Sequence, residues 1–342
     1  MPQKVRFGLI GYGAWGSHHA RAIAESEVAE LGAIAVRSPA RQAEARQRHP
    51  GVEIVADYHQ LLARADLEVV DVVLPTDLHF PVGRDVLCAG KHLLLEKPMA
   101  LQLEDCQELL RLAQEKNRLL AIGHEFRLSS LWGKVKEMID AGAIGEPLYA
   151  LIELWRNPYR TGADGWRYQI DRVGNWILEE PIHFFDLARW YLSGVGEPVS
   201  VFARANARRP DHPELQDNFS AIVNFPGGAY AVISQTLSAF EHHQVAKVTG
   251  TRGALWASWS GAMDRTFHPT FWLKYHDGEK ITDIAITKIT GEVYELADEV
   301  AQVAHAVRGN GGLAATGEDG LWSVKMCLKA QESVESGGVV AV

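Results

Sequence analysis

The sequence predicts two domains: an N-terminal doubly wound parallel α/β sheet, and a C-terminal α+β domain with a large, open, mostly antiparallel sheet. A strand, a glycine-rich turn and a helix follow one another within residues 5–24. Strands and helices then alternate to about residue 122, which indicates right-handed crossovers on both faces of a parallel sheet. From residue 148 the chain changes to segments that alternate in period two, separated by turns such as Pro226-Gly227. We expect the domains to span 1–122 and 123–342, with helices near the C-terminus packing back against them.

Composition narrows the classes of function. A formal net charge of −9 argues against a nucleic-acid partner, because phosphate binding needs a basic surface. The sequence contains no apolar run near the roughly 20 residues of a membrane helix. A strand begins at Val5, which leaves no room for a signal peptide. Cys88, Cys106 and Cys327 are scattered and show no metal-binding spacing. We therefore expect a cytoplasmic protein with reduced thiols, no metal and no membrane partner.

The glycine-rich turn predicts a dinucleotide site. The strand Val5–Ile10 runs into Gly11-Tyr12-Gly13-Ala14-Trp15-Gly16, and a helical pattern covers 17–24. Gly11 permits a tight turn, Gly13 lets the backbone approach a pyrophosphate, and Gly16 lets helix and strand pack closely. The helix N-terminus supplies unpaired N–H groups for the phosphates. Glycines that only form a loop are the alternative, and the strand before and helix after them argue against it.

The next strand bears on the choice between NADP and NAD. It covers 29–36 and ends where an acidic residue normally binds the ribose, but Arg37 and Ser38 stand there instead. A guanidinium pairs bidentately with a 2′-phosphate, whereas an acid would repel it. This favours NADP. The alternative is that Arg37 stacks on the adenine while NAD binds.

Two further polar segments follow buried strands of the same sheet. The strand 67–74 ends in a turn that contains Pro75, Thr76 and His79, a bed for the nicotinamide. Three leucines at 93–95 then lead into Glu96 and Lys97. The carboxyl ends of parallel strands are where such sheets bind ligands, and a lysine placed there needs a compensating interaction. The alternative is a strand end whose Lys97 only reaches water. The other expected elements of this part are the helices 39–49, 57–65, 81–89 and 103–116 and the strands 51–55 and 119–124, the last ending in His124.

The glycine loop, the Pro75-Thr76…His79 turn and Glu96-Lys97-Pro98 together resemble the Gfo/Idh/MocA oxidoreductases, a family that includes inositol dehydrogenases and glucose–fructose oxidoreductase. The resemblance implies a Rossmann domain, with Lys97 in the active site and Glu96 beside the cofactor. It extends to Gly145-Glu146-Pro147, the turn into the second domain. It also implies a homodimer or homotetramer formed through the C-terminal sheet.

The second domain carries its chemistry on residues 174–186. A helix is expected from about Pro181, and His183 and Asp186 share one of its faces, with Glu179 on the entering turn. By itself such a His–Asp pair is more often structural. The family's usual pattern is Asp-x-x-x-His with a catalytic histidine. The resemblance therefore makes His183 the acid/base, with Glu179 in place of the aspartate.

Aromatic and basic residues indicate the substrate class. Arg156 and Arg160 flank one aromatic stretch, and Trp166-Arg167 begins another. Aromatic faces suit sugar rings, and arginines bind carboxylates or phosphates. We predict a sugar or polyol substrate, with an anionic group as an option. The expected substrate-binding residues are Lys97, His124, Arg156, Arg160, Trp166, Arg167, Asn175, Trp176 and His183.

These residues predict an NAD(P)-dependent oxidoreductase that oxidises a secondary hydroxyl of a sugar, sugar acid or polyol. His183 takes the hydroxyl proton, hydride passes to nicotinamide C4, and Lys97 stabilises the developing alkoxide. A ketone or enone reductase of the same family is one alternative. A non-catalytic cofactor-binding sensor is another, although the presence of both Lys97 and His183 argues against it.

Overall fold

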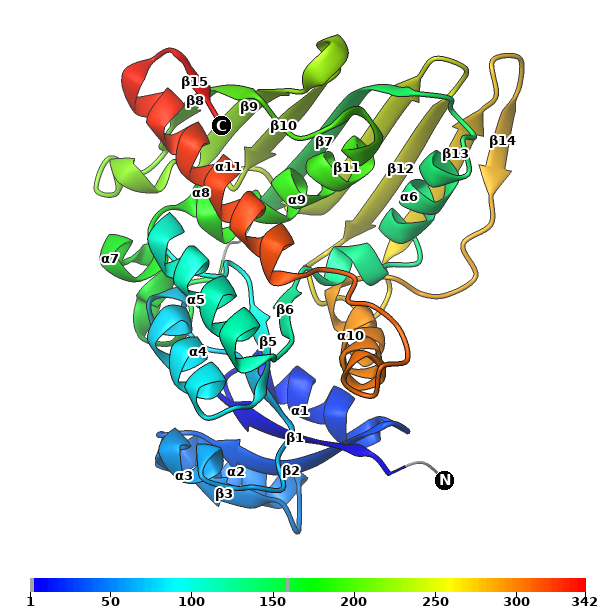
Figure 1. The fold of residues 1–342 in the computed structure, drawn as a ribbon. Helices are drawn as coiled ribbons and strands as arrows, with labels where there is room; N and C mark the ends of the chain where they lie inside the picture. The colour runs from blue at the N-terminus through cyan, green and yellow to red at the C-terminus, as the bar shows by residue number, and fades with distance from the viewer. Residues whose placement is uncertain (1–2, 158–159) are drawn as a thin grey trace. The chain divides into compact units, whose positions relative to one another are not determined.

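The computed structural model describes residues 3–157 and 160–342 (Figure 1). The chain forms two compact units. The first contains the residues up to Glu125 together with Glu295–Leu321, and the second contains Phe126–Tyr294 and Trp322–Val342. The chain therefore returns to the first unit near its end, which a single division at 122/123 does not express.

The first unit is built on a six-stranded parallel sheet with the order β3-β2-β1-β4-β5-β6. This order confirms the predicted doubly wound sheet. Successive strands are added toward one side from β1 to β3 and toward the other side from β4 to β6, so the switch point lies between β1 and β4. The strands are β1 Val5–Ile10, β2 Ala29–Ala35, β3 Glu53–Val55, β4 Val69–Val72, β5 His92–Glu96 and β6 Leu120–Gly123. The glycine loop, the Pro75 turn and Lys97 follow β1, β4 and β5, and they share one edge of this sheet.

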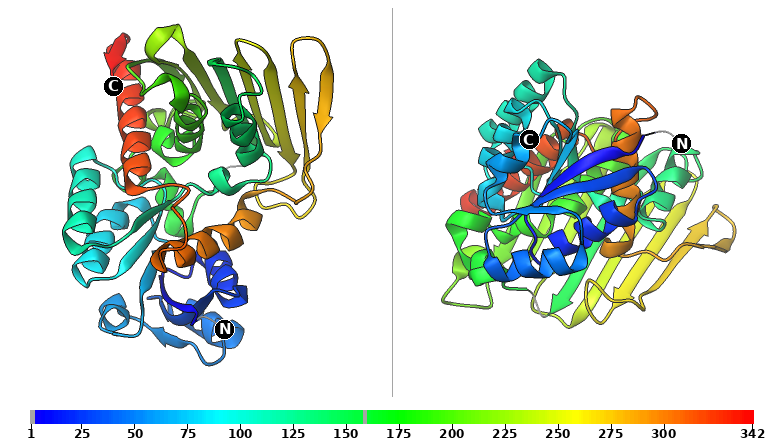
Figure 2. Two further views of the ribbon diagram at one scale, coloured as in Figure 1. Left: turned by 45° about the vertical axis from the view of Figure 1, so that its right-hand side comes forward. Right: turned by 90° about the horizontal axis from the view of Figure 1, so that it is seen from below.

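The helices of the first unit are α1 Gly16–Glu25, α2 Pro39–Arg48, α3 Tyr58–Leu62, α4 His79–Cys88, α5 Leu103–Lys116 and most of α10 Glu292–Val307. Helix α3 is shorter than the predicted 57–65: Asp57 caps its start by accepting from His59 N, and it ends at Leu62. Helix α10 lies beside α1 (Figure 2), and its Leu296, Val300 and Val303 join the core formed by β1 and α1.

The second unit is built on a nine-stranded sheet with the order β14-β13-β12-β11-β7-β10-β9-β8-β15. Among the strands of the described ranges, β7 pairs with β10 in parallel and the other pairs of this sheet are antiparallel, so the sheet is mostly antiparallel, as predicted. The strands are β7 Pro147–Asn157, β8 Ser200–Asn206, β9 Asn218–Asn224, β10 Tyr230–Thr236, β11 Glu241–Gly250, β12 Ala254–Gly261, β13 Thr270–His276, β14 Ile281–Ile284 and β15 Val339–Ala341.

Helices cover one face of this sheet and leave the other open. The helices of the second unit are α6 Trp132–Asp140, α7 Ile170–Val173, α8 Trp176–Glu179, α9 Ile182–Tyr191 and most of α11 Gly317–Ser336. Helix α9 packs on β7 and β10, and α6 packs on α9 and β12 (Figure 1). Burial alternates along β10, as expected for a sheet with one covered face. Among the described residues, none of the helices is both long and apolar enough to cross a membrane.

Candidate active site

The glycine loop has the geometry of a phosphate cradle. Gly11 has φ +103°, and a Cβ there would lie 2.1 Å from the carbonyl oxygen of Val73. A Cβ on Gly16 would lie 2.1 Å from the carbonyl oxygen of Gly11, whereas a Cβ on Gly13 would meet nothing within 4 Å. The fold itself therefore requires glycine at 11 and 16, whereas the space next to the backbone of Gly13 is unoccupied by protein atoms. Open backbone at the start of α1 fits a dinucleotide pyrophosphate.

The side chains of the glycine loop serve different purposes. Tyr12 is buried in the core, where its ring and that of His49 form a T-shaped pair with centroids 5.8 Å apart. The carbonyl of Ala14 accepts a 3.0 Å hydrogen bond from Ser17 Oγ. Trp15 is half-buried, and its indole donates to Glu96 Oε1 at 2.7 Å. Trp15 is thus the side chain that ties the loop to the strand end carrying Lys97.

The end of β2 carries an exposed arginine beside a helix N-terminus. Ser38 caps α2 by accepting from Arg41 N at 3.5 Å, which leaves its hydroxyl hydrogen available to an acceptor. Arg37 is exposed, and it has no ion pair within residues 3–157 and 160–342, whereas Arg41 pairs with Glu44 at 2.6 Å. Arg37 and Ser38 are therefore both exposed at the end of β2, and their contact with a 2′-phosphate stays a prediction.

The turn after β4 is tied to the residue that follows Lys97. Pro75 precedes a short 3₁₀ helix, Thr76–Leu78, and the ring of His79 is buried. Its Nδ1 lies 2.6 Å from the carbonyl oxygen of Pro98 and its Nε2 lies 2.8 Å from that of Leu74. A carbonyl oxygen only accepts, so the ring is the donor in a hydrogen bond to either of them. The predicted nicotinamide bed is thereby fixed to the lysine segment.

Lys97 follows a carboxylate that is held from two sides. Glu96 accepts from Trp15 through Oε1 and from the main-chain N–H of Lys97 through Oε2 at 3.2 Å. Burial alone would raise the pKa of Glu96, but His19, Trp15 and the charge of Lys97 outweigh it and lower that pKa. The half-buried Lys97 therefore stands next to the loop that would hold the cofactor. His124 is buried at the end of β6, one strand further along the sheet edge.

In the second unit, His183 lies in the first turn of α9. Its ring stacks on Phe126, with centroids 4.6 Å apart and planes 22° apart, and it is 7% exposed. Asp186, which shares a helix face with it, forms a buried bidentate pair with Arg127 at 2.8 and 2.7 Å. Asp186 also accepts from Ser323 Oγ at 3.3 Å. Its role is therefore to anchor α9.

Glu179 ends α8, and its buried carboxylate forms an ion pair with Nε of the half-buried Arg167. The guanidinium of Arg167 lies 4.8 Å from the centroid of the Trp166 ring. The main-chain carbonyl of Arg167 accepts a hydrogen bond from Trp176 Nε1 at 2.9 Å. Asn175 caps α8 by accepting from Leu178 N at 2.9 Å. These contacts bind residues 166–179 into one unit. The expected effect of Glu179 on His183 remains a prediction.

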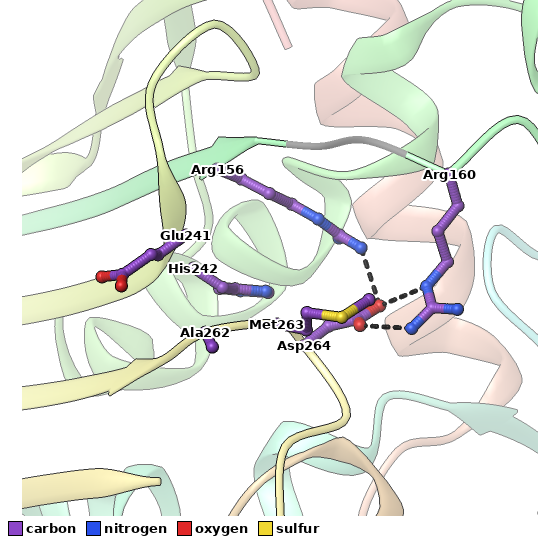
Figure 3. A pocket seen from close by; sticks show the side chains of 7 residues that line it. All are labelled: Arg156, Arg160, Glu241, His242, Ala262, Met263 and Asp264. Atoms are coloured by element: carbon purple, nitrogen blue, oxygen red, sulfur yellow. Dashed lines mark hydrogen bonds and ion pairs between the residues drawn. The ribbon is translucent and has the colours of Figure 1, made fainter.

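Arg156 and Arg160 converge on an aspartate that the sequence did not suggest (Figure 3). Arg156 pairs with Asp264 and with Glu180, each at 2.7 Å, and Arg160 pairs bidentately with Asp264 at 3.0 and 2.6 Å. Burial opposes ionisation of Asp264, but the two arginines outweigh it and hold its pKa far below the usual range. Protein carboxylates thus already balance these arginines. The neighbouring Pro158 and Tyr159 lie outside the described residues.

The same arginines line a small cavity together with Glu241, His242, Ala262, Met263 and Asp264. Its volume is about 80 Å³. Ligand pockets usually exceed about 300 Å³, whereas a single water needs about 10–15 Å³. The cavity is therefore of a size for a few waters or a small polar group.

Sequence reasoning did not single out a buried group of charged side chains in the first unit. His19, Asp71, Glu96 and Glu299 are all nine-tenths or more buried. Asp71 gave a usable signal, because a charged residue within an otherwise apolar β4 needs a partner. Glu299 gave no such signal, because it lies 228 residues after Asp71 in the chain and nothing in the sequence indicates that the two are close in the fold.

A doubly wound sheet with this glycine loop defines an NAD(P)-binding domain, and its partner domain carries a histidine and charged residues suited to hydroxyl chemistry. Residues 5–124 match the family described as "Oxidoreductase family, NAD-binding Rossmann fold", and residues 132–256 match "GFO/IDH/MocA C-terminal domain". The chain belongs to the GFO/IDH/MocA oxidoreductase family. It is an NAD(P)-dependent oxidoreductase, as the sequence predicted.

Individual relatives point in the same direction. The chain is 31% identical to inositol 2-dehydrogenase of Rhizobium meliloti, over 96% of this chain and 97% of that one. It is 34% identical to dTDP-3,4-didehydro-2,6-dideoxy-alpha-D-glucose 3-reductase of Streptomyces violaceoruber, over 72% of this chain and 69% of that one. A solved structure of a putative myo-inositol dehydrogenase from Sinorhizobium meliloti has TM-score 0.83 at 27% identity, covering 99% and 100% of the two chains.

Proposed function

We propose that this protein oxidises a secondary hydroxyl of a neutral sugar or polyol with NADP as the preferred cofactor. The observation that carries the proposal is the 2.7 Å hydrogen bond between Trp15 of the glycine loop and Glu96. This bond puts Lys97, the next residue, beside the loop that would hold the cofactor. An ammonium at that place can stabilise an alkoxide formed next to the nicotinamide.

Each chemical role falls to a residue of this chain. A nicotinamide cofactor, held by the glycine loop, would supply the hydride acceptor. His183, as a neutral imidazole, takes the proton from the substrate hydroxyl, and its stacking on Phe126 limits how far the ring can turn. Lys97 donates a hydrogen bond to the same oxygen. Glu179, held by Arg167, has the role of orienting or polarising His183.

The balance of charge supports a neutral substrate. Arg156 and Arg160 were the residues that suggested an anionic group, and their guanidiniums are paired with Asp264 and Glu180. An anionic substrate would have to displace a buried carboxylate from two arginines, which costs several kcal/mol. Hydroxyl groups can instead share these partners by hydrogen bonding. A relative named inositol 2-dehydrogenase agrees with this substrate class.

Turnover of a panel of neutral polyols and sugar acids, with NADP⁺ and NAD⁺, tests the reaction. His183→Ala should lower kcat by about 10²–10⁴-fold, the usual contribution of a general base, and leave the Kd for the cofactor unchanged. The exposed His268 provides the matched control, because His268→Ala should leave kcat as in the wild type. Turnover by His183→Ala equal to wild type would contradict the proposed base. Preference for sugar acids would contradict the neutral substrate.

The cofactor preference has its own test. Fluorescence titration should give a lower Kd for NADPH than for NADH, and Arg37→Ala should remove the difference. A single charge-assisted bidentate contact contributes about 1.5–3 kcal/mol, or about 10- to 150-fold in Kd. Arg41→Ala is the control, because Arg41 is already paired with Glu44. Equal affinity for both cofactors in the wild type would leave Arg37 as a neighbour of the adenine and would refute the NADP assignment.

A ketone reductase is the second candidate, since the chain is 34% identical to a sugar 3-reductase. The same residues then act in reverse: His183 gives its proton to the carbonyl oxygen while Lys97 polarises it. Comparing kcat/KM for matched alcohol and ketone pairs separates the two directions. A value for the ketone higher by tenfold or more at neutral pH would favour the reductase.

We also propose that the open face of the nine-stranded sheet joins copies of this chain into a homodimer or homotetramer. Two aromatic pairs lie on that face, the half-buried Tyr149 with the exposed Tyr230 and the exposed Trp256 with the exposed Trp272, each with ring centroids 5.0 Å apart. Exposed aromatic surface of this kind usually meets a partner. Light scattering should give a dimer or tetramer for the wild type, and Tyr230→Lys should shift it toward the monomer. A monomeric wild type would refute this proposal.

A further inference from the structure

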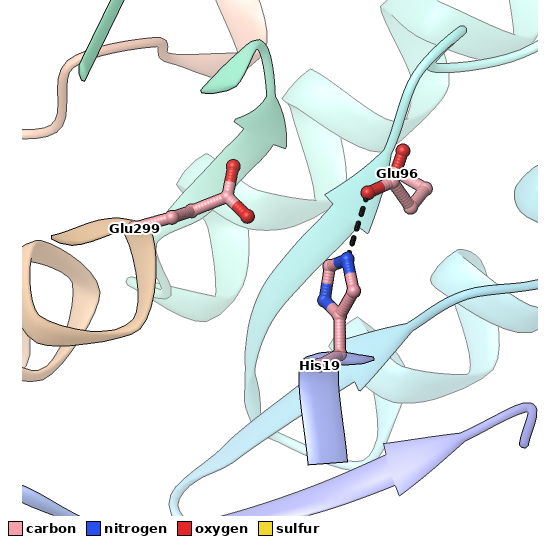
Figure 4. A group of neighbouring side chains, drawn as sticks. All are labelled: His19, Glu96 and Glu299. Atoms are coloured by element: carbon pink, nitrogen blue, oxygen red, sulfur yellow. Dashed lines mark ion pairs between the residues drawn. The ribbon is translucent and has the colours of Figure 1, made fainter. Parts of the chain in front are cut away.

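Four titratable side chains from four elements meet in the interior of the first unit, behind the glycine loop. His19 comes from α1, Asp71 from β4, Glu96 from the end of β5 and Glu299 from α10. Three of them, His19, Glu96 and Glu299, each offer a ligand-type atom, and these atoms lie within 4.8 Å of one another (Figure 4). One imidazole therefore faces three carboxyl groups at a site from which water is largely excluded.

His19 is held between two of the carboxylates. Its Nδ1 lies 2.8 Å from Asp71 Oδ2, a hydrogen bond in which the ring donates. Its Nε2 lies 3.0 Å from Glu96 Oε1, an ion-pair contact. Burial disfavours the charged ring, yet Asp71 and Glu96 outweigh burial and raise the pKa of His19 well above its ordinary value. His19 is therefore a cation at neutral pH.

Glu96 connects the buried cluster to the glycine loop and to the lysine segment. Its Oε1 meets both His19 and the indole N–H of Trp15, and its Oε2 accepts from the main-chain N–H of Lys97. Three partners thus fix one carboxylate, and one of them belongs to the glycine loop and another to the lysine segment. A change in the orientation of Glu96 would disturb both at once.

Glu299 supplies the third carboxyl group. Its Oε2 is fully buried without a hydrogen bond to any residue in the described ranges, and it points toward His19 and Glu96 (Figure 4). Burial is the largest influence on this group, and repulsion from Glu96 and Asp71 adds to it, so that the pKa of Glu299 rises to about 8 although His19 opposes the rise. At neutral pH Glu299 therefore holds a proton.

We propose that His19 is a positioning residue, which as a cation between Asp71 and Glu96 orients Glu96 to hold Trp15 and Lys97, and that the proton on Glu299 preserves this arrangement. When Glu299 loses its proton, a third anion competes for His19 and repels Glu96. Glu96 then turns away from Trp15, and the glycine loop loses its anchor. The proposal rests on the proposed place of Lys97 beside the cofactor, but its readout is cofactor binding, which needs no substrate.

The main test measures the Kd of NADPH from about pH 6 to about pH 10 for the full-length protein. In the wild type the Kd should rise by about fivefold or more through the pKa of about 8, within the usual range for coupled sites. Glu299→Gln keeps the shape and neutrality of the protonated acid, so its Kd should stay level through the same range. Glu318→Gln, an exposed change of the same charge, should follow the wild type. An alkaline rise that persists in Glu299→Gln would overturn the proposal.

A second measurement observes the carboxyl group and the anchor directly. The infrared band of a protonated carboxyl should be present at neutral pH, vanish above about pH 8 and be absent from Glu299→Gln. The NMR resonance of the Trp15 indole N–H, assigned with Trp15→Phe, should move with the same midpoint and should move in His19→Gln at neutral pH. An indole resonance that is unchanged in both conditions would refute positioning by His19.

Two other results have definite meanings. A stoichiometric divalent metal in the purified protein, lost from both His19→Gln and Glu299→Gln, would overturn the proposal, because the three groups would then be ligands instead of a proton-holding network. A Kd for NADPH that does not change with pH in the wild type would also overturn it. Pronounced pH-dependent binding without turnover of any polyol or ketone would refute the proposed reaction and support the positioning network.

Discussion

Replacing Glu299 by glutamine should change how the stability of the protein depends on pH. A carboxyl group whose pKa is about 8 when buried and 4.5 when exposed binds a proton more tightly in the folded than in the unfolded state. Between these two pH values the folded state therefore holds a proton that the unfolded state has released. The free energy of unfolding then falls as pH rises across this window, by about 1.4 kcal/mol for each pH step.

Over the whole window this amounts to about 5 kcal/mol, which is lost once the pH exceeds the folded-state pKa of about 8. Glutamine has no proton to lose, so Glu299→Gln should show no such contribution. The variant should gain on the wild type steadily from about pH 5 to about pH 8 and level off beyond. Because all other titrating groups are shared, they cancel in the difference between the two proteins.

The assay is urea unfolding of the full-length chain without cofactor, followed by far-ultraviolet circular dichroism at several pH values. Wild type and Glu299→Gln are compared in the same buffers, with the exposed Glu318→Gln as a control that should run parallel to the wild type. A difference between wild type and Glu299→Gln that stays constant from about pH 5 to about pH 9 would show that Glu299 is ionised throughout. That result would refute the reasoning from burial and repulsion.

Two further predictions concern stability and cofactor binding. Gly16→Ala should unfold at a clearly lower temperature than the wild type, because its Cβ would lie 2.1 Å from a backbone oxygen. Gly13→Ala, whose Cβ would meet nothing within 4 Å, should keep the wild-type melting temperature and lose affinity for NADPH. Equal melting temperatures of the two variants would contradict the loop geometry. Asp186→Asn should destabilise the protein by about 3–5 kcal/mol, because it removes the carboxylate that pairs bidentately with the buried Arg127. Glu332→Gln at an exposed pair should cost at most about 1 kcal/mol. Denaturant midpoints measure both changes, and similar shifts would refute the anchoring role.

Several features of the site follow from short segments of the sequence. The strand, glycine turn and helix of residues 5–25 form from local patterns, and the close backbone contacts at 11 and 16 leave room for glycine alone. Lys97 could be placed at the ligand-binding edge because the carboxyl ends of parallel strands share one edge. The alternating strands of the second unit likewise predicted a sheet with one covered face.

The choice of partners could not be read from the chain. Asp186 was adjacent to His183 on a helix, but it pairs with Arg127, and Arg156 and Arg160 meet Asp264 more than 100 residues away. Which oppositely charged groups pair depends on distances that only folding creates, because any arginine can bind any carboxylate. The parallel pairing of β7 with β10 is of the same kind, since alternation fixes a face but not a neighbour.

The sequence by itself determined the two domains, the dinucleotide loop and the position of Lys97, because each depends on a local pattern of residue types and backbone freedom. Only the tertiary structure decided that His19, Asp71, Glu96 and Glu299 share one buried site. Their charges are ordinary one by one. Their protonation states are set by burial and by mutual attraction and repulsion over a few ångströms, and these exist only when α1, β4, β5 and α10 have packed together.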